Sequence, residues 1–264
     1  MNKKQKEILN KILSDRTSGS YEILLKLNKL ILSEKNDKKF IYETIAKSKT
    51  KLSHFAAIND YFDKIENLLK KENLNDLHNY LTGIASSESL KFDIILKKIS
   101  KKLLGANLIL TISKSGTLIN IFKMWHEKNK NLKLVICESR PSNEGKLMAK
   151  ELLNAGIKVT MITDAMAGIF LPKIDAVLTG ADAILKNGNV INKVGSMSLA
   201  LLCKHFKKPF YVITTRSKYV KNNKLRINGD LPDPVWKFRH KNLTTTNILF
   251  EEVDKNLITE IITD

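Results

Sequence analysis

Cysteine is scarce in this sequence, and long apolar segments are missing. The 264 residues include 2 cysteines, and no apolar run reaches the roughly 18 residues that a membrane-spanning helix needs. The first seven residues hold three lysines and one glutamate in place of the apolar stretch of a secretory signal. We therefore expect a protein that is made and kept in the cytoplasm and has no membrane partner.

Clusters of metal-ligating residues are missing as well. Cys137 and Cys203 lie in segments with the patterns of a strand and a helix, and no cysteine and histidine are spaced in a way that suits zinc. None of the 5 histidines lies four residues from another, which is the spacing of a helical metal pair. These absences predict two buried thiols, no metal and no cofactor.

Acidic residues are outnumbered by basic ones. There are 45 Lys and Arg against 27 Asp and Glu, which gives a formal net charge of +18. Such an excess raises the question of nucleic-acid binding, because cations that neutralise phosphates supply most non-specific affinity. The lysines are spread through predicted helices, however, and aromatic residues make up only 7% of the chain. We interpret the charge as a solvated surface and do not expect nucleic acid as a partner.

The first 104 residues carry a helical pattern. Apolar residues recur at spacings of three and four, as in Leu24, Leu27, Leu30 and Ile31. Residues 15–20 interrupt the first two helices with polar residues and a glycine, which suit a turn followed by an N-cap. This pattern predicts an N-terminal helical domain over residues 1–104.

From Ala106 onward, short β-branched runs alternate with helical ones, which is typical of βαβ units and a parallel sheet. Asn187-Gly188 between two further apolar pairs predicts a small antiparallel hairpin. We therefore predict an α/β fold with a Rossmann-like, mostly parallel sheet domain over residues 105–264. The five predicted strands are Asn107–Ile112, Lys133–Cys137, Lys158–Ile162, Ala176–Leu178 and Phe210–Ile213.

Small, polar or charged residues follow each of these strands. In a parallel sheet the carboxyl ends of the strands share one edge, and ligands of open α/β sheets bind just outside it. The sequence therefore predicts one cleft at that edge. The segments concerned are residues 113–117, 138–141, 163–165, 180–182 and 214–216.

Several of these residues suit a phosphate. Ser115, Gly116 and Thr117 open a predicted helix, whose free N–H groups favour an anion. Arg140 and Lys193 could complete the cradle, because guanidinium and ammonium groups both bind phosphoryl oxygens. The alternative is that the serine and threonine are ordinary N-caps and that Arg140 is a surface residue.

Two aspartates stand at strand ends. Asp182 lies at the tip of an apolar strand, where a carboxylate costs desolvation free energy unless it meets a donor, a cation or a substrate hydroxyl. For Asp182 we favour a functional role over a buried cap. Asp164 either contributes to the cleft or caps the short helix that follows it.

Five motifs, in order along the chain, resemble those of one family. That family joins the alpha, beta and delta subunits of translation initiation factor 2B with methylthioribose-1-phosphate isomerase and ribose-1,5-bisphosphate isomerase. The resemblance implies a helical N-terminal domain, a Rossmann-like C-terminal domain, dimers or higher assemblies, and a sugar-phosphate pocket between the two domains. The motifs are residues 15–20, 138–145, 163–168, 180–184 and 192–195.

The resemblance leaves two kinds of function, isomerase and non-catalytic initiation-factor subunit. The isomerases use an acid/base pair of a cysteine and an aspartate; this chain keeps the aspartate, as Asp182, but has Ser113 at the place of the cysteine. A serine hydroxyl has no accessible anion without a neighbouring base, so it is a poor proton carrier. The isomerases' glycine- and arginine-rich phosphate loop has only a partial counterpart in residues 16–20, including Arg16.

Two hypotheses follow from the resemblance. The first is a regulatory protein, similar to the initiation factor 2B subunits, that binds a phosphorylated sugar or nucleotide, with a second copy or a translation factor as protein partner. The second is an aldose–ketose isomerase acting on a ribose-1-phosphate derivative, with Asp182 as acid/base and Ser113 or Lys114 in the role of the cysteine. Whether the chain is an enzyme stays open here. The ligand-binding residues would be Arg16, Ser115, Gly116, Arg140, Asp164, Asn192 and Lys193.

Overall fold

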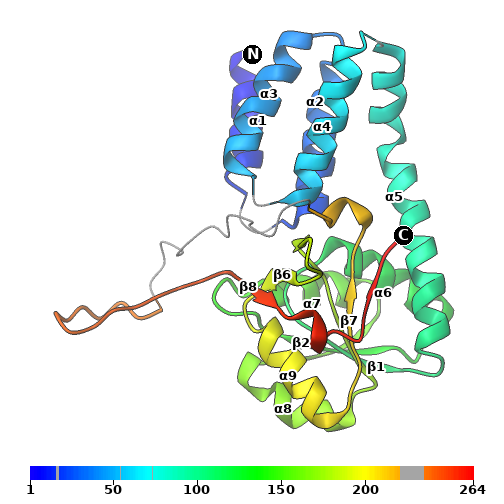
Figure 1. Ribbon diagram of the computed structural model, residues 1–264, viewed down its shortest axis with the longest axis vertical. Helices are drawn as coiled ribbons and strands as arrows, with labels where there is room; N and C mark the ends of the chain where they lie inside the picture. Colours follow the sequence, from blue (N-terminus) through cyan, green and yellow to red (C-terminus); the bar gives the residue numbers. More distant parts are fainter. Residues whose placement is uncertain (16–17, 54, 73, 221–234) are drawn as a thin grey trace.

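The structure, a computed structural model, describes residues 1–15, 18–53, 55–72, 74–220 and 235–264 (Figure 1). The first part of the chain is helical, as predicted. Its helices are α1 (Lys3–Leu13), α2 (Ser20–Ser33), α3 (Lys38–Lys51), α4 (Ala56–Lys70) and α5 (Leu74–Lys102).

Helices α1 to α4 and the first half of α5 pack around an apolar core. A capping box at Asn2 starts α1, and the Asp37 carboxylate accepts a hydrogen bond from the Phe40 N–H at the start of α3. Inside the core, the Tyr61 hydroxyl donates to the Asn28 side chain, which in turn donates to the Leu81 carbonyl at 2.9 Å. This buried chain of hydrogen bonds links α2, α4 and α5.

The long helix α5 serves two cores. Leu77 and Leu81 belong to the core of the helical part, whereas Phe92, Ile95 and Ile99 belong to the core under the sheet. In Figure 1 the helix runs from the bundle down along the sheet. The domain limits expected from the sequence stay a prediction, and the sheet's apolar core extends into this helix.

The second part of the chain is a six-stranded sheet in the order β3-β2-β1-β4-β7-β9, in which every pair of neighbours is parallel. One face packs on α5, α6 and α7, and the other on α8 and α9. The strands are β1 (Leu108–Thr111), β2 (Lys133–Cys137), β3 (Lys158–Ile162), β4 (Ala176–Thr179), β7 (Phe210–Ile213) and β9 (Glu260–Ile262). The helices are α6 (Gly116–Lys128), α7 (Glu144–Asn154), α8 (Ala167–Phe170) and α9 (Ser196–Phe206).

A second, three-stranded sheet holds the predicted hairpin. Strands β5 (Ala183–Ile184) and β6 (Val190–Lys193) are antiparallel, and β8 (Phe250–Val253) adds to β6. Before β8, the segment from residue 235 onward extends away from the body of the molecule (Figure 1) and returns to it at Leu249, whose carbonyl accepts a hydrogen bond from the Val194 N–H. The five strands predicted from the sequence are all present, and the α/β class is confirmed, while β8 and β9 were not predicted.

No helix among the described residues is both long and apolar enough to cross a membrane.

Candidate functional site

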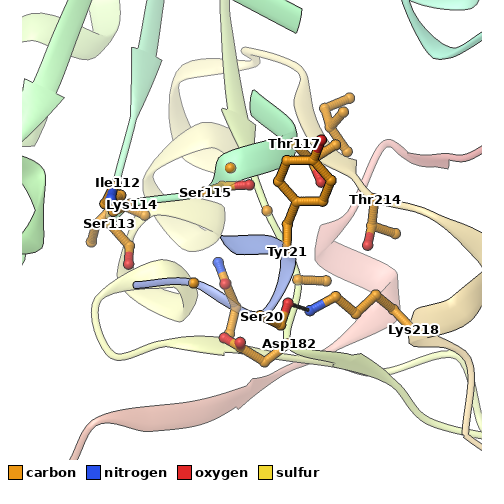
Figure 2. Close-up of a pocket in the computed structure, with 16 residues that line it drawn as sticks. Ser20, Tyr21, Ile112, Ser113, Lys114, Ser115, Thr117, Asp182, Thr214 and Lys218 are labelled. Carbon is orange, nitrogen blue, oxygen red and sulfur yellow. Dashed lines mark hydrogen bonds between the residues drawn. The ribbon is translucent and has the colours of Figure 1, made fainter. Parts of the chain in front are cut away.

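A small cavity lies at the carboxyl edge of the large sheet, where β1, β4 and β7 end and the start of α2 faces them (Figure 2). The chain runs outward from β1 to β3 and then crosses back to β4, so the cavity sits at the switch point where ligands of such sheets bind. Its volume is about 40 Å³, which is room for a few water molecules. The wall comes from residues 19–21, 112–117 and 180–182, and from Asn192, Ile213, Thr214 and Lys218.

The loop after β1 forms one side of the cavity. Ser113 has a positive φ of 68°, and its N–H donates to the Ser139 hydroxyl at 2.6 Å. Ser115 is the N-cap of α6 and accepts a hydrogen bond from the Leu118 N–H at 3.3 Å. Both serines therefore help to shape the loop. The hydrogen bond of Ser115 is that of an ordinary helix N-cap, which was the alternative to phosphate binding.

Glycines let this loop approach its neighbours. A Cβ on Gly116 would lie 3.0 Å from the Tyr21 ring of α2, and a Cβ on Gly180 would lie 2.9 Å from the Ser115 hydroxyl. A side chain at either position would push the start of α2 or the β4 loop away from the cavity. The close packing of three segments thus accounts for the small volume.

Asp182 lies on the cavity wall, directly before β5. Its backbone N–H donates to the Ile191 carbonyl at 2.8 Å, which ties the aspartate to the hairpin. Among the described residues, none donates a hydrogen bond to the Asp182 carboxylate, so its oxygens are available to a ligand hydroxyl. Asn192 of β6 reaches the same cavity, and its amide donates to the Ser196 hydroxyl at 2.9 Å.

Lys218 is a cavity residue that the sequence reasoning missed. Its side chain extends across the cavity to the hydroxyl of Ser20, the first residue of α2, beside Asp182 (Figure 2). Burial lowers the pKa of the Lys218 ammonium, while the negative charges of Asp182 and Glu88 act in the opposite direction. The sequence feature that could have identified Lys218 is its place in the segment after β7, because that strand end was expected to face the cleft.

The predicted phosphate ligands Arg140 and Asp164 lie outside the cavity wall. The Asp164 carboxylate accepts hydrogen bonds from the N–H groups of Ser139 and Arg140, at 2.9 and 2.7 Å. Asp164 thereby holds the loop after β2, and the Arg140 side chain is exposed to solvent. Arg16, which was also predicted to bind the ligand, lies outside the described residues.

Lys193 is also directed away from the cavity. Successive side chains of a strand point to opposite faces, so Asn192 faces the cavity and its neighbour Lys193 does not. The Lys193 ammonium is 2.7 Å from Glu144 at the start of α7 and 5.0 Å from the centre of the Phe250 ring. With 2% of its surface exposed, Lys193 forms a buried ion pair.

Lys114 is held in an ion-pair network. Its ammonium lies 2.7 Å from Glu22 of α2 and 3.0 Å from Glu151 of α7. Burial lowers the pKa of Lys114, but the hydrogen bonds and charges of the two glutamates outweigh it and raise the pKa above its ordinary value. A lysine held protonated in this way is a poor proton acceptor at neutral pH.

Both thiols are buried, as predicted. Cys137 lies inside β2, where burial, with the charges of Asp164 and Glu138, raises its pKa to about 12. Cys203 lies in α9, and burial raises its pKa to about 12 as well. Neither thiol lines the cavity, and no group of three or more His, Cys, Asp or Glu in the described part of the chain is placed to hold a metal ion.

Comparison with known proteins agrees with this architecture. The sequence profile of the initiation factor 2 subunit family matches residues 8–264. The chain belongs to that family. Members of the initiation factor 2 subunit family that resemble it carry two kinds of name, translation factor and isomerase, as the motifs indicated.

Three similar proteins illustrate these two kinds of name. A translation initiation factor eIF-2B subunit 2-like protein of Pyrococcus abyssi is 28% identical over 269 residues, covering 98% of this chain and 94% of that protein. A ribose 1,5-bisphosphate isomerase of Methanocaldococcus jannaschii is 33% identical over 162 residues, covering 59% of this chain and 53% of that protein. The crystal structure of the Pyrococcus horikoshii translation initiation factor eIF-2B has the same fold, with a TM-score of 0.83, 24% identity, and coverage of 100% of this chain and 96% of that one.

Proposed function

We propose that this chain is a regulatory protein of the initiation factor 2B type, which binds a phosphorylated sugar or nucleotide at the sheet edge, against the residues that line the cavity. One observation carries the choice over an isomerase: no thiol reaches the cavity, because Ser113 stands where the isomerases have a cysteine and both cysteines are buried elsewhere. The Asp182 carboxylate on the wall, to which no described residue donates a hydrogen bond, would accept hydrogen bonds from the ligand's hydroxyl groups.

In this proposal, the groups that bind the phosphate are polar groups on the wall of the cavity. Ser115 and Gly116 begin α6, and the N-terminal N–H groups of a helix favour an anion. Asn192 adds an amide from β6. Arg140 and Lys193 keep only an indirect role in this proposal, since their side chains are exposed and ion-paired, respectively.

The family resemblance also supports an assembly of two or more copies and a place in the cytoplasm. A translation factor would be the protein partner of such an assembly. Both assignments rest on the resemblance to the family.

The test is a thermal-shift panel. Pentose phosphates, methylthioribose-1-phosphate and nucleoside monophosphates are each compared with the matching unphosphorylated compound, because a ligand of the folded state raises Tm by mass action. We expect at least one phosphorylated compound to raise Tm and its unphosphorylated partner to leave it unchanged. A panel without any phosphate-dependent shift would remove the proposal.

Aldose–ketose isomerisation is the second candidate, because Asp182 is retained on the cavity wall and relatives are named isomerases. The discriminating measurement is incubation of ribose 1,5-bisphosphate and methylthioribose-1-phosphate with the protein in deuterium oxide. An isomerase that works through an enediolate removes the proton at carbon two of the aldose and places solvent deuterium at carbon one of the ketose product. We expect no product from either substrate, and deuterated product would establish the enzyme.

A further inference from the structure

Aromatic and basic residues alternate in the segment that precedes β8. Figure 1 shows this segment extending away from the body of the molecule, and residues 235–250 include no Asp or Glu. Alternate side chains of an extended chain point to the same side, so the pattern places the rings together, with a cation between neighbouring rings along the chain. The alternating residues are Trp236, Lys237, Phe238, Arg239, His240 and Lys241.

The three rings form a stack. The ring centres of Trp236 and Phe238 are 4.7 Å apart, with 27° between the planes, and those of Phe238 and His240 are 6.4 Å apart, with 6° between the planes. The Asn242 N–H donates to the His240 Nδ1 at 3.1 Å, which orients the histidine ring. The stack is nevertheless open to solvent, because 58% of the surface of Trp236 and 53% of that of Phe238 are exposed.

A hollow of about 420 Å³ lies among these side chains, lined by residues 236–240, Leu243 and Thr245. Apolar side chains that gather on a protein surface mark a site of interaction. A ligand that suits this one combines flat rings, which stack on aromatic side chains, with negative charges, which pair with the cations between them. Single-stranded nucleic acid has this combination, because its base faces are accessible and each nucleotide carries a phosphate.

Charge favours this ligand over a second copy of the chain. A copy would bring the same net charge of +18 to a contact that is already basic, whereas phosphates neutralise the cations. The low overall content of aromatic residues argued against nucleic acid, but two of them and a histidine lie within five positions here, among lysine and arginine. A duplex is disfavoured because its base faces are already stacked on one another.

We propose that residues 236–241 bind single-stranded nucleic acid, RNA or DNA. The bases stack on the rings of Trp236, Phe238 and His240, and the cations between the rings pair with the phosphates. Stacking accepts any base, so the site has little sequence preference. It is separate from the cavity at the sheet edge and does not depend on the ligand proposed for that cavity.

The first experiment tests stacking, by fluorescence anisotropy with labelled oligouridylate, oligothymidylate and duplex RNA. Trp236→Ala and Phe238→Ala should each weaken binding of both single strands roughly 5- to 150-fold, the range for one base stacked on one ring. Tyr42→Ala is the control, because Tyr42 of α3 is an aromatic residue with 44% of its surface exposed, and it should change nothing. A stacked base should also quench the fluorescence of Trp236, over a constant signal from the buried Trp125.

The second experiment tests the phosphate contacts through their dependence on salt. The slope of log affinity against log salt concentration should fall by about 2 in the triple variant Lys237→Gln, Arg239→Gln and Lys241→Gln, because each phosphate contact with a single strand contributes about 0.7. The control variant removes as many charges from exposed lysines around the start of β2 and should keep the slope. Its changes are Lys128→Gln, Lys130→Gln and Lys133→Gln.

Each contrary result overturns the proposal. Wild type that binds no strand, or that binds duplex as tightly as single strands, would do so, as would equal affinity of Trp236→Ala, Phe238→Ala and wild type. Size-exclusion chromatography tests the other occupant: a wild-type dimer that Phe238→Ala converts to a monomer, without strand binding, would show that a second copy covers the rings. These variants change exposed side chains, so Tm should stay constant and lost binding would not reflect unfolding.

Discussion

At the scale of single residues, the cavity combines a carboxylate with hydroxyl groups and a buried cation. Asp182 offers acceptors, Ser113 offers a hydroxyl in a loop of positive φ, and Lys218 offers a positive charge. These groups can hold a polar, anionic molecule. None of the three is a thiol.

Replacing Asp182 by asparagine tests the carboxylate. The amide preserves the shape of the side chain but removes the charge that hydroxyl donors would meet, so the fold should persist and the ligand should bind about 2 kcal/mol more weakly. The measurement is calorimetric titration with the phosphorylated compound that most raises Tm of the wild type. Equal affinity of the two proteins would show that the ligand's hydroxyl groups do not contact Asp182.

The two native thiols should be inert in the folded protein. Burial raises the pKa of Cys137 and of Cys203 to about 12, so the reactive thiolate is scarce at neutral pH. We expect a disulfide reagent to label neither thiol in buffer and both in guanidinium chloride. Ser113→Cys is the positive control, because it places a thiol on the cavity wall, and it should label in buffer. Rapid labelling of the wild type would contradict the burial of one native cysteine.

At the scale of elements, the site depends on close crossings between segments that are far apart in the sequence. The tightest is at the start of α7, where a Cβ on Gly145 would lie 1.9 Å from the carbonyl oxygen of Cys137 in β2. Gly116 and Tyr21 form a similar, looser crossing between α6 and α2. Such contacts bring α7 and α2 against the strand ends that carry the loops of the cavity.

Gly145→Ala should destabilise the protein by about 3 kcal/mol, because the methyl group would overlap the β2 backbone and force α7 away. Gly83→Ala is the matched control. Gly83 lies inside α5, where an added Cβ meets nothing within 4 Å, so alanine should stabilise the helix by about 0.5 to 1 kcal/mol. Denaturant unfolding of both variants measures the two changes, and similar effects at the two sites would show that Gly145 is not in close contact.

At the scale of the whole molecule, a helical part and a sheet part meet along α5 and at the cavity. The C-terminal half of α5 packs under the sheet. The contacts of Lys218 with Ser20 and of Lys114 with Glu22 tie α2 to two loops at the carboxyl edge of the sheet. A ligand that enters the cavity therefore touches both parts. The stability of the molecule includes the cost of holding a charged lysine at this junction.

The cost of burying the charge of Lys218 should make the stability of the protein depend on pH. Burial lowers the pKa of Lys218 below 10.5, its ordinary value, so between the two values the unfolded chain binds more protons than the folded one. Stability linked to Lys218 therefore rises with pH through that window and is constant below it. We expect the free energy of unfolding of wild type, minus that of Lys218→Met, to increase as the pH approaches 10.5. A difference that stays flat or falls would mean that burial does not penalise the charge.

The sequence by itself determined the fold class and the places of the main strands. Runs such as Lys133–Cys137 and Phe210–Ile213 are β-rich and bounded by polar residues, and Asn187-Gly188 suits a two-strand turn, so local preference and long-range pairing agree there. The convergence of strand ends at one edge followed from parallel topology alone, which is why Asp182, Ser113 and Ser115 were found.

Only the tertiary structure decided which polar residues enter the cavity and which serve the fold. Asp164 is occupied by two backbone N–H groups, and Lys193 points to the opposite face of its strand from Asn192. Lys218 enters because a short segment after β7 turns back toward α2, and strands β8 and β9 form because distant strands offer them an edge to pair with. Side-chain direction and partners of this kind depend on contacts between residues far apart in the chain, which no local pattern of sequence records.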